Sequence, residues 1–222
     1  MSNPLSVVIS TRKIDDTYVS AIEKRFCDPR TEINIYENDG ISSLAEIYNI
    51  GLNDSKNDIV VFMHDDLIIE TPDITKILTR LFENNPEFGI IGIAGTNNLL
   101  NGMWWQDRSS MQGQVKHLHN GKIHRNNYSK DFGNKLKEVI AVDGLFFAVC
   151  KSRIKDNFDE EFTGFHFYDI PFCVANYTSG VKIGVTTKII VVHKSVGAVN
   201  KEWETNKGKF ESKYGHLLPL TI

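Results

Sequence analysis

The chain has 222 residues, of which 41% are hydrophobic and 24% are charged, which is ordinary usage for a globular protein. A formal net charge of −3 and the lack of a long basic run argue against a nucleic-acid partner. The three cysteines, Cys27, Cys150 and Cys173, are odd in number and far apart in sequence, so we expect reduced, mostly buried thiols without disulfides or a cysteine zinc site.

The first residues carry no signal-peptide pattern, and a strand is predicted to begin at Leu5. No apolar run approaches the roughly 20 residues that are needed to span a bilayer. We therefore expect a cytoplasmic protein, and peripheral membrane association stays open as an addition to that expectation.

The first 95 residues alternate between strand and helix patterns. Short apolar runs rich in β-branched residues predict strands, and apolar residues repeated every three or four positions predict helices. The predicted strands are 5–10, 32–36, 59–63 and 88–94, and the predicted helices are 14–26, 43–52 and 71–82. This repetition predicts a three-layer α/β/α fold with a mostly parallel, doubly wound sheet.

Two helix starts carry their own signals. Ser43 and Glu46 have the spacing of a capping box, which predicts a helix beginning next to Ser43. Thr71 followed by Pro72 predicts an N-cap and a first helical residue.

The alternation stops at residues 96–137, which are polar and dotted with glycine and predict a long, irregular, functional loop. Strand 139–149, helix 168–177, one or two strands within 181–193 and a polar surface helix 201–214 are predicted to follow. We treat the chain as a single domain of 1–222 with a first half (1–95), an inserted region (96–138) and a second half (139–222).

The segment His64-Asp65-Asp66 directly follows the apolar strand 59–63. Ligands of open parallel sheets bind at the carboxyl ends of strands, and carboxylates crowded there repel each other unless a cation joins them. Because side chains alternate along a strand, His64 and Asp66 share a face that Asp65 does not. The segment predicts a divalent metal site on Asp66, with His64 beside it, although an Asp after a strand also serves as an ordinary cap.

The apolar strand, the acidic cluster and the following Leu67-Ile68-Ile69 resemble the DxD element of GT-A fold glycosyltransferases, the family 2-like enzymes above all. His64 departs from the pattern because it stands in place of the first Asp. The resemblance implies a nucleotide-diphospho-sugar transferase, with 1–95 as its nucleotide-sugar-binding half, 96–138 as an acceptor-side loop region and 139–222 as its acceptor and catalytic half.

Other segments resemble the same family in the same order. Ser10-Thr11-Arg12 is similar to its first nucleotide loop, Glu37-Asn38-Asp39-Gly40 to its base- or ribose-binding element, and Asn49-Ile50-Gly51 to the Asn-x-Gly before its metal strand. Asp143-Gly144 resembles the entry to the acceptor half. His193 resembles a late histidine that touches metal or diphosphate.

The segment 162–169 resembles the one that ends in the catalytic acid of the family, which implies that Asp169 is the general base of an inverting transfer. Pro171 departs from the pattern, since many relatives carry an acidic residue there. An imidazole near the metal favours Mn²⁺ over Mg²⁺.

Further residues are candidates for substrate contacts. Trp104 and Trp105 would stack on sugar rings, although we expect at least one of them to anchor the loop in the core. The substrate-binding set is Arg12, Glu37, Asp39, Asn49, Asp65, Trp104, Trp105, Asp143, Gly144 and His166, and the metal set is Asp66, His193 and His64. Arg12 has an equal reading as a solvated surface residue, and we expect His117, His119 and His124 to be solvated loop histidines.

The expected activity is metal-dependent transfer of a sugar, with a UDP-sugar as the favoured donor and GDP or dTDP as alternatives. A polysaccharide, glycan or glycolipid precursor is the acceptor that the resemblance implies. Two other functions stay open. One is a catalytically degenerate fold that only binds saccharide or a partner, and the other is a nucleotidyltransferase, which the lack of glycine after the first strand disfavours.

Overall fold

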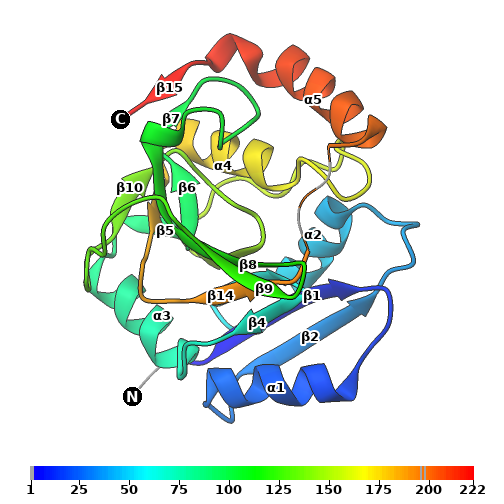
Figure 1. The fold of residues 1–222 in the computed structure, drawn as a ribbon, viewed down its shortest axis with the longest axis vertical. Coiled ribbons are helices and arrows are strands. Elements are labelled where there is room, and N and C mark those ends of the chain that lie inside the picture. The colour runs from blue at the N-terminus through cyan, green and yellow to red at the C-terminus, as the bar shows by residue number, and fades with distance from the viewer. Residues whose placement is uncertain (1–2, 196, 198) are drawn as a thin grey trace.

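The computed structural model describes residues 3–195, 197 and 199–222. A seven-stranded sheet forms the centre, in the order β10-β13-β5-β12-β3-β1-β2, and helices flank it (Figure 1). The strands of this sheet are β1 (Leu5–Thr11), β2 (Glu32–Glu37), β3 (Ile59–His64), β5 (Phe88–Gly92), β10 (Lys137–Val139), β12 (Phe146–Cys150) and β13 (Lys182–Val185). The predicted three-layer α/β class is confirmed.

The central sheet is mixed in direction. β1 pairs in parallel with both β2 and β3, as the alternating pattern predicts, and β5 pairs in parallel with β13. β12, however, runs antiparallel between β3 and β5, and β10 runs antiparallel to β13. An apolar run such as β12 shows that a strand is covered on both faces, but it carries no information on direction.

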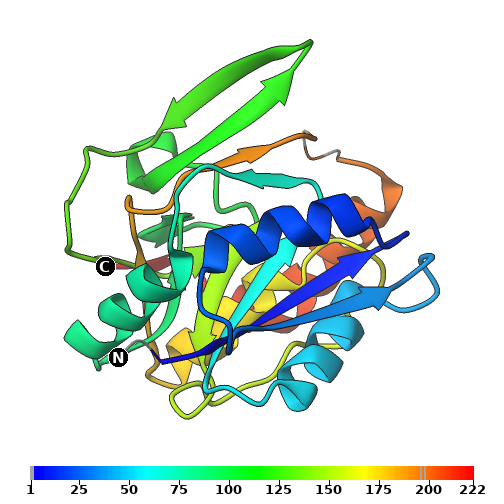
Figure 2. The same cartoon turned by 90° about the horizontal axis from the view of Figure 1, so that it is seen from below.

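The order of β2, β1 and β3 places the first two helices on opposite faces. From β1 to β2 the chain moves toward one edge of the sheet, and from β2 to β3 it moves back past β1. Because such crossovers are right-handed, α1 (Asp16–Phe26) and α2 (Leu44–Asp54) must lie on opposite faces, as Figure 2 shows. On the α2 face, Gly51 lets the helix approach β1, because a Cβ at this position would lie 2.4 Å from Val8 Cγ1.

An aromatic ladder joins α2 to α4 (Asp169–Thr178) across this face. Tyr48 of α2 contacts Phe62 of β3, Phe62 stacks on Phe147 of β12, and Phe147 contacts Phe172 of α4. The helix α5 (Lys201–Tyr214) packs on α4 (Figure 1). This helix is polar as predicted, but Trp203 and Phe210 are buried, so only part of its surface faces solvent.

A second, smaller sheet has the order β11-β6-β8-β14-β4, with β9 paired to β8. Its strands are β4 (Leu67–Ile69), β6 (Ala94–Thr96), β8 (Met111–His119), β9 (Lys122–Asn127), β11 (Ala141–Val142) and β14 (Val191–His193). The short strands β7 (Asn98–Leu99) and β15 (Leu220–Thr221) pair with each other, and two 3-10 turns cover Arg108–Ser110 and Gly215–Leu217.

The prediction of an irregular loop at 96–137 was therefore wrong. β8 and β9 form a hairpin that projects from the body of the molecule (Figure 2). Asn120 and Gly121 connect the strands with φ values of 50° and 72°, as a two-residue type I′ turn requires. The Asn-Gly pair was the available signal. Both strands are polar in the outer part of the hairpin, which hides the alternation that normally reveals a strand.

The structure supports one predicted helix start and corrects the other. Ser43 caps α2 in a full capping box with Glu46. The next helix, α3 (Ile74–Asn84), begins two residues after Pro72, and its N-cap is Asp73. Thr71 is engaged elsewhere, because its hydroxyl accepts a hydrogen bond from Ile190 N at 2.8 Å.

Within the described chain, every helix is too short or too polar to span a bilayer. Cys150 and Cys173 are buried free thiols, whereas Cys27 is free and exposed.

Candidate active site

The carboxyl ends of the first three strands meet at one edge of the central sheet. Thr11 of β1 lies opposite Glu37 of β2, and Ser10 lies opposite His64 of β3. The hydroxyl of Thr11 donates a 2.7 Å hydrogen bond to Asp65 Oδ2. The sheet thus brings the predicted nucleotide loop, Glu37 and Asp65 to the same edge.

Two other predicted substrate residues lie on exposed loops near this edge. Arg12 directly follows β1 and is exposed. Asp39 is also exposed, and its Oδ1 accepts a 3.3 Å bond from Ile41 N in a turn where Gly40 has a φ of 96°. Neither residue lines the cavity described below, and their binding roles stay predictions.

Asn49 lies on α2 and holds the segment after β12. Its side-chain amide donates to Phe158 O at 2.9 Å and to Glu160 Oε1 at 2.7 Å, and its Oδ1 accepts from Phe158 N at 2.9 Å. The structure therefore places the polar atoms of Asn49 in contacts with this segment and not in the cavity.

His64, Asp66 and His193 form a cluster of potential metal ligands. Each offers one nitrogen or carboxylate oxygen, and these atoms all lie within 4.8 Å of one another. The two sheets create the cluster: His64 ends β3, Asp66 precedes β4, and β14 places His193 opposite Leu67. Lys194 N also donates to Asp66 O at 3.1 Å.

The electrostatics of this cluster suit a cation. Burial disfavours the charge of Asp66, but contacts with His193 and Ser195 together hold the pKa of this carboxyl well below its usual range. Oδ1 of Asp66 is buried and accepts no hydrogen bond of good geometry among the described residues, although His193 Nε2 lies 3.2 Å away. Burial, with the neighbouring His193, lowers the pKa of His64 to about 4, so the imidazole is neutral and keeps a lone pair.

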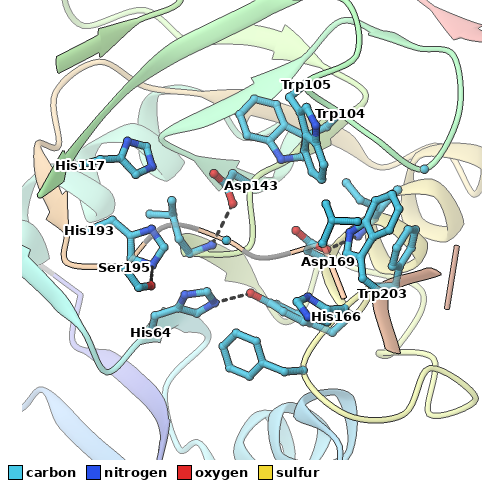
Figure 3. A pocket seen from close by; sticks show the side chains of 18 of the residues that line it. His64, Trp104, Trp105, His117, Asp143, His166, Asp169, His193, Ser195 and Trp203 are labelled. Atoms are coloured by element: carbon cyan, nitrogen blue, oxygen red, sulfur yellow. Dashed lines mark hydrogen bonds between the residues drawn. The ribbon is translucent and has the colours of Figure 1, made fainter. Parts of the chain in front are cut away.

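Tyr168 orients His64. Its hydroxyl lies 2.6 Å from His64 Nε2, a bond that is drawn as a dashed line from His64 in Figure 3. Gly144 leaves room for the tyrosine, since a Cβ at Gly144 would lie 2.3 Å from Tyr168 Oη. A hydrogen bond to one imidazole nitrogen fixes the ring and leaves the other nitrogen for a ligand.

Asp143 and Asp169 reach the same site from different elements. β12 pairs with β3, so His64 N donates to Leu145 O at 3.0 Å, and this pairing brings Asp143-Gly144 beside His64. Asp169 begins α4, and its two carboxylate oxygens accept bonds from Gly144 N and Ile170 N, each at 2.9 Å. Pro171 is tolerated there because the first turn of a helix does not use the missing N–H.

Burial raises the pKa values of both acids. The pKa of Asp169 rises to about 6, although its bonds from Ile170 and Gly144 oppose the rise. The pKa of Asp143 rises to about 7 through burial and then through repulsion by Asp169. A pair of carboxyl groups with displaced pKa values in a cleft is typical of a site for proton transfer.

These groups face a cavity of about 390 Å³, within the usual range for small-molecule sites (Figure 3). Its walls are largely aromatic. They include Trp104, Trp105, Tyr128, Phe165, Phe167 and Trp203, together with His64, His117, Asp143, His166, Asp169 and His193. Trp104 is buried, as expected for one residue of the pair, and Trp105 is 43% exposed.

Among the cavity residues that sequence patterns missed, His117, Trp203 and Tyr168 carry polar or aromatic groups of interest. His117 was expected in a solvated loop, but it lies on β8 beside His193, half-buried; His119 and His124 are exposed as expected. Trp203 lies in the polar helix α5, where Trp203, Asn206 and Phe210 share the buried face, and this spacing was the available signal. No local pattern marks Tyr168 as a partner of His64.

Replacing Asp143 with Asn is expected to stabilise the fold at neutral pH. The folded protein holds a proton on Asp143 up to about pH 7, whereas an unfolded Asp loses it near pH 4, so the wild-type carboxyl lowers stability increasingly as pH rises between these values. At pH 8 the variant should gain about 1–3 kcal/mol of unfolding free energy, since each pH unit of displacement corresponds to about 1.4 kcal/mol. Urea denaturation at pH 8 and pH 4.5 measures this gain, and an equal gain at both pH values would contradict the explanation.

Comparison with solved structures places this fold among the GT-A glycosyltransferases. The chain resembles GalNAc-T7 with UDP, GalNAc and Mn2+ (TM-score 0.64, 11% identity, 95% of this chain and 48% of that one). It also resembles S. aureus TarS 1–349 in complex with UDP-GlcNAc (0.55, 13%, 87% and 60%) and A197 from STIV (0.51, 12%, 87% and 86%). This chain thus spans about half of the GalNAc-T7 chain and three fifths of the TarS chain.

A family model described as a glycosyltransferase-like family matches residues 8–214, and the chain belongs to this family. This family is of the glycosyltransferase family 2-like type. A search of proteins with curated functions found no match to the sequence.

Proposed function

We propose that the protein is a metal-dependent, inverting glycosyltransferase that moves a sugar from a UDP-sugar to a hydroxyl of a saccharide or glycolipid. The observation that carries this proposal is that Asp169 lines the same cavity as His64 and His193, which form a cluster of ligand atoms with Asp66. GalNAc-T7 is similar in fold and has been solved with UDP and Mn2+, and the similar TarS with UDP-GlcNAc, which supports the choice of donor and metal.

The residues of the cluster fit a divalent cation. The buried Asp66 Oδ1 needs a positive partner, and two imidazoles beside one carboxylate suit Mn²⁺ better than Mg²⁺. When bound there, the cation would offset the negative charge that develops on the departing diphosphate. His64, Asp66 and His193 would hold it, and Tyr168 would keep His64 in place.

Asp169 would accept the proton of the acceptor hydroxyl. As that oxygen forms its bond to the anomeric carbon, the bond from this carbon to the diphosphate breaks, and its electron pair leaves with the diphosphate. The backbone bonds from Gly144 and Ile170 fix the carboxylate in one orientation. A pKa of about 6 leaves it ionised at neutral pH but more basic than an exposed Asp.

A thermal-shift experiment tests the proposal. With Mn²⁺ and a UDP-sugar at about 100 times its Kd, linkage predicts about 2.7 kcal/mol of stabilisation, or roughly 5–10 °C in Tm for a chain of this size. EDTA should remove the shift, and GDP- and dTDP-sugars should give smaller ones. A shift of equal size in EDTA, or none with any nucleotide sugar, would contradict it. Release of pyrophosphate from a nucleoside triphosphate would identify a nucleotidyltransferase instead.

A further inference from the structure

The side chains that line the aromatic cavity include acids but, among the described residues, no lysine or arginine. These acids are Asp143 and Asp169.

The two carboxylates differ in their freedom to bind a ligand. Both oxygens of Asp169 already accept backbone hydrogen bonds of 2.9 Å. Asp143 makes one hydrogen bond among the described residues, a long one of 3.4 Å from Leu145 N to Oδ1. In Figure 3 the carboxylate of Asp143 points into the cavity, below Trp104 and Trp105. The carboxyl group of Asp143 is therefore available to bind a substrate group, whereas backbone bonds fix Asp169 for its proposed role as the base.

The indole rings that line the same cavity complete this environment. Trp105 meets Trp104 edge-on at 6.1 Å between ring centroids, and Trp203 lies 6.2 Å from Trp105. Trp105 is 43% exposed, so an indole surface stays free at the cavity. Indole rings pack on the apolar faces of other rings, and their electron-rich faces attract ammonium groups.

Resting on the proposed transfer reaction, we infer that the acceptor is an amino sugar, whose ring packs on the exposed indole of Trp105 and whose free ammonium group pairs with Asp143. A neutral sugar offers no positive partner to the ionised form of Asp143. An acidic sugar would place a further carboxylate beside those of Asp143 and Asp169. The amine thus supplies a positive charge that no described lysine or arginine of the lining provides.

Binding of four methyl glycosides to the protein with Mn²⁺ and UDP tests this inference. The glycosides share one ring and differ at one position: methyl glucosaminide, its N-acetyl form, methyl glucoside and methyl glucuronide. A hydrogen bond to a charged group predicts about tenfold tighter binding of the free amine than of the N-acetyl and neutral sugars. The glucuronide should bind at least tenfold more weakly than the glucoside. Titrations followed by NMR give the four dissociation constants.

Two variants separate charge recognition from stacking. Asp143→Asn should abolish the preference for the amine. Trp105→Ala should weaken the binding of all four sugars by similar factors and leave their order of affinity unchanged. The inference is overturned if the N-acetyl sugar binds as tightly as the amine, if the glucuronide binds as tightly as the glucoside, or if Asp143→Asn keeps the preference. Failure of the proposed transferase function would give a different result, because Mn²⁺ and a UDP-sugar would then cause no shift in Tm.

Discussion

Replacing Asp169 with Asn is expected to lower kcat by about 10²–10⁴-fold, the usual contribution of a positioned general base. The amide cannot accept the acceptor proton, although it occupies nearly the same volume. It also loses one of the two backbone bonds, because the amide nitrogen that replaces one carboxylate oxygen cannot accept from Gly144 N or Ile170 N. Donor binding should survive, since the UDP-sugar is expected to contact the metal cluster and the edge formed by β1, β2 and β3.

The pH dependence provides an independent check on the same residue. The base works in its ionised form, so log(kcat/KM) should rise with a slope of one as pH increases and level off above about pH 6, the pKa to which burial raises Asp169. In Asp169→Asn this rise should disappear. Steady-state assays of UDP release between pH 5 and pH 8 measure both profiles.

The matched control is Asp143→Asn, which removes the neighbouring acid of the same cavity. It should mainly raise the KM for the acceptor, because Asp143 is free for recognition and Asp169 carries the proton transfer. If Asp169→Asn kept near-wild-type turnover while Asp143→Asn lost it, the base would be Asp143 and the present assignment would be wrong.

The sequence predicted most of the elements because their signals are local. The apolar runs of β1 and β3 and the capping box at Ser43 depend on residues within a few positions of each other. The antiparallel direction of β12 depends instead on how the chain enters this strand through Asp143-Gly144, beside His64. Hydrophobic periodicity contains no information on strand direction, so a mostly parallel sheet was the natural expectation.

The cavity shows the same division. The positions of Asp66, His193 and Asp169 followed from strand ends and from the family resemblance, and the structure brings these three residues to one site. Trp203 and His117 reach it from α5 and from the hairpin strand β8, which are distant in sequence. Their side chains come together only after the two sheets and α5 have packed. Local sequence patterns therefore placed Trp203 on a surface helix and His117 in a loop.

Asp66→Asn is expected to lower the affinity for Mn²⁺ more than a substitution of His64 or His193 does. Asp66 supplies the only carboxylate of the cluster among the described residues, and His64 and His193 are imidazoles. Loss of a partner that merely orients a ligand typically lowers metal affinity 10–100-fold, so loss of the charged ligand itself should lower it by about 100-fold or more. Isothermal titration with Mn²⁺ measures this change without reference to activity.

Asp65→Asn is the matched control, because it removes the same charge one residue away. Asp65 is exposed and accepts a hydrogen bond from Thr11, and it lies outside the cluster of three ligand atoms. Its substitution should change Mn²⁺ affinity less than tenfold, since the attraction between exposed charges is weak in water. Equal losses in the two variants would show that general negative charge attracts the ion. Unchanged binding in Asp66→Asn would place the metal elsewhere and remove the basis for a metal-assisted transfer at this cavity.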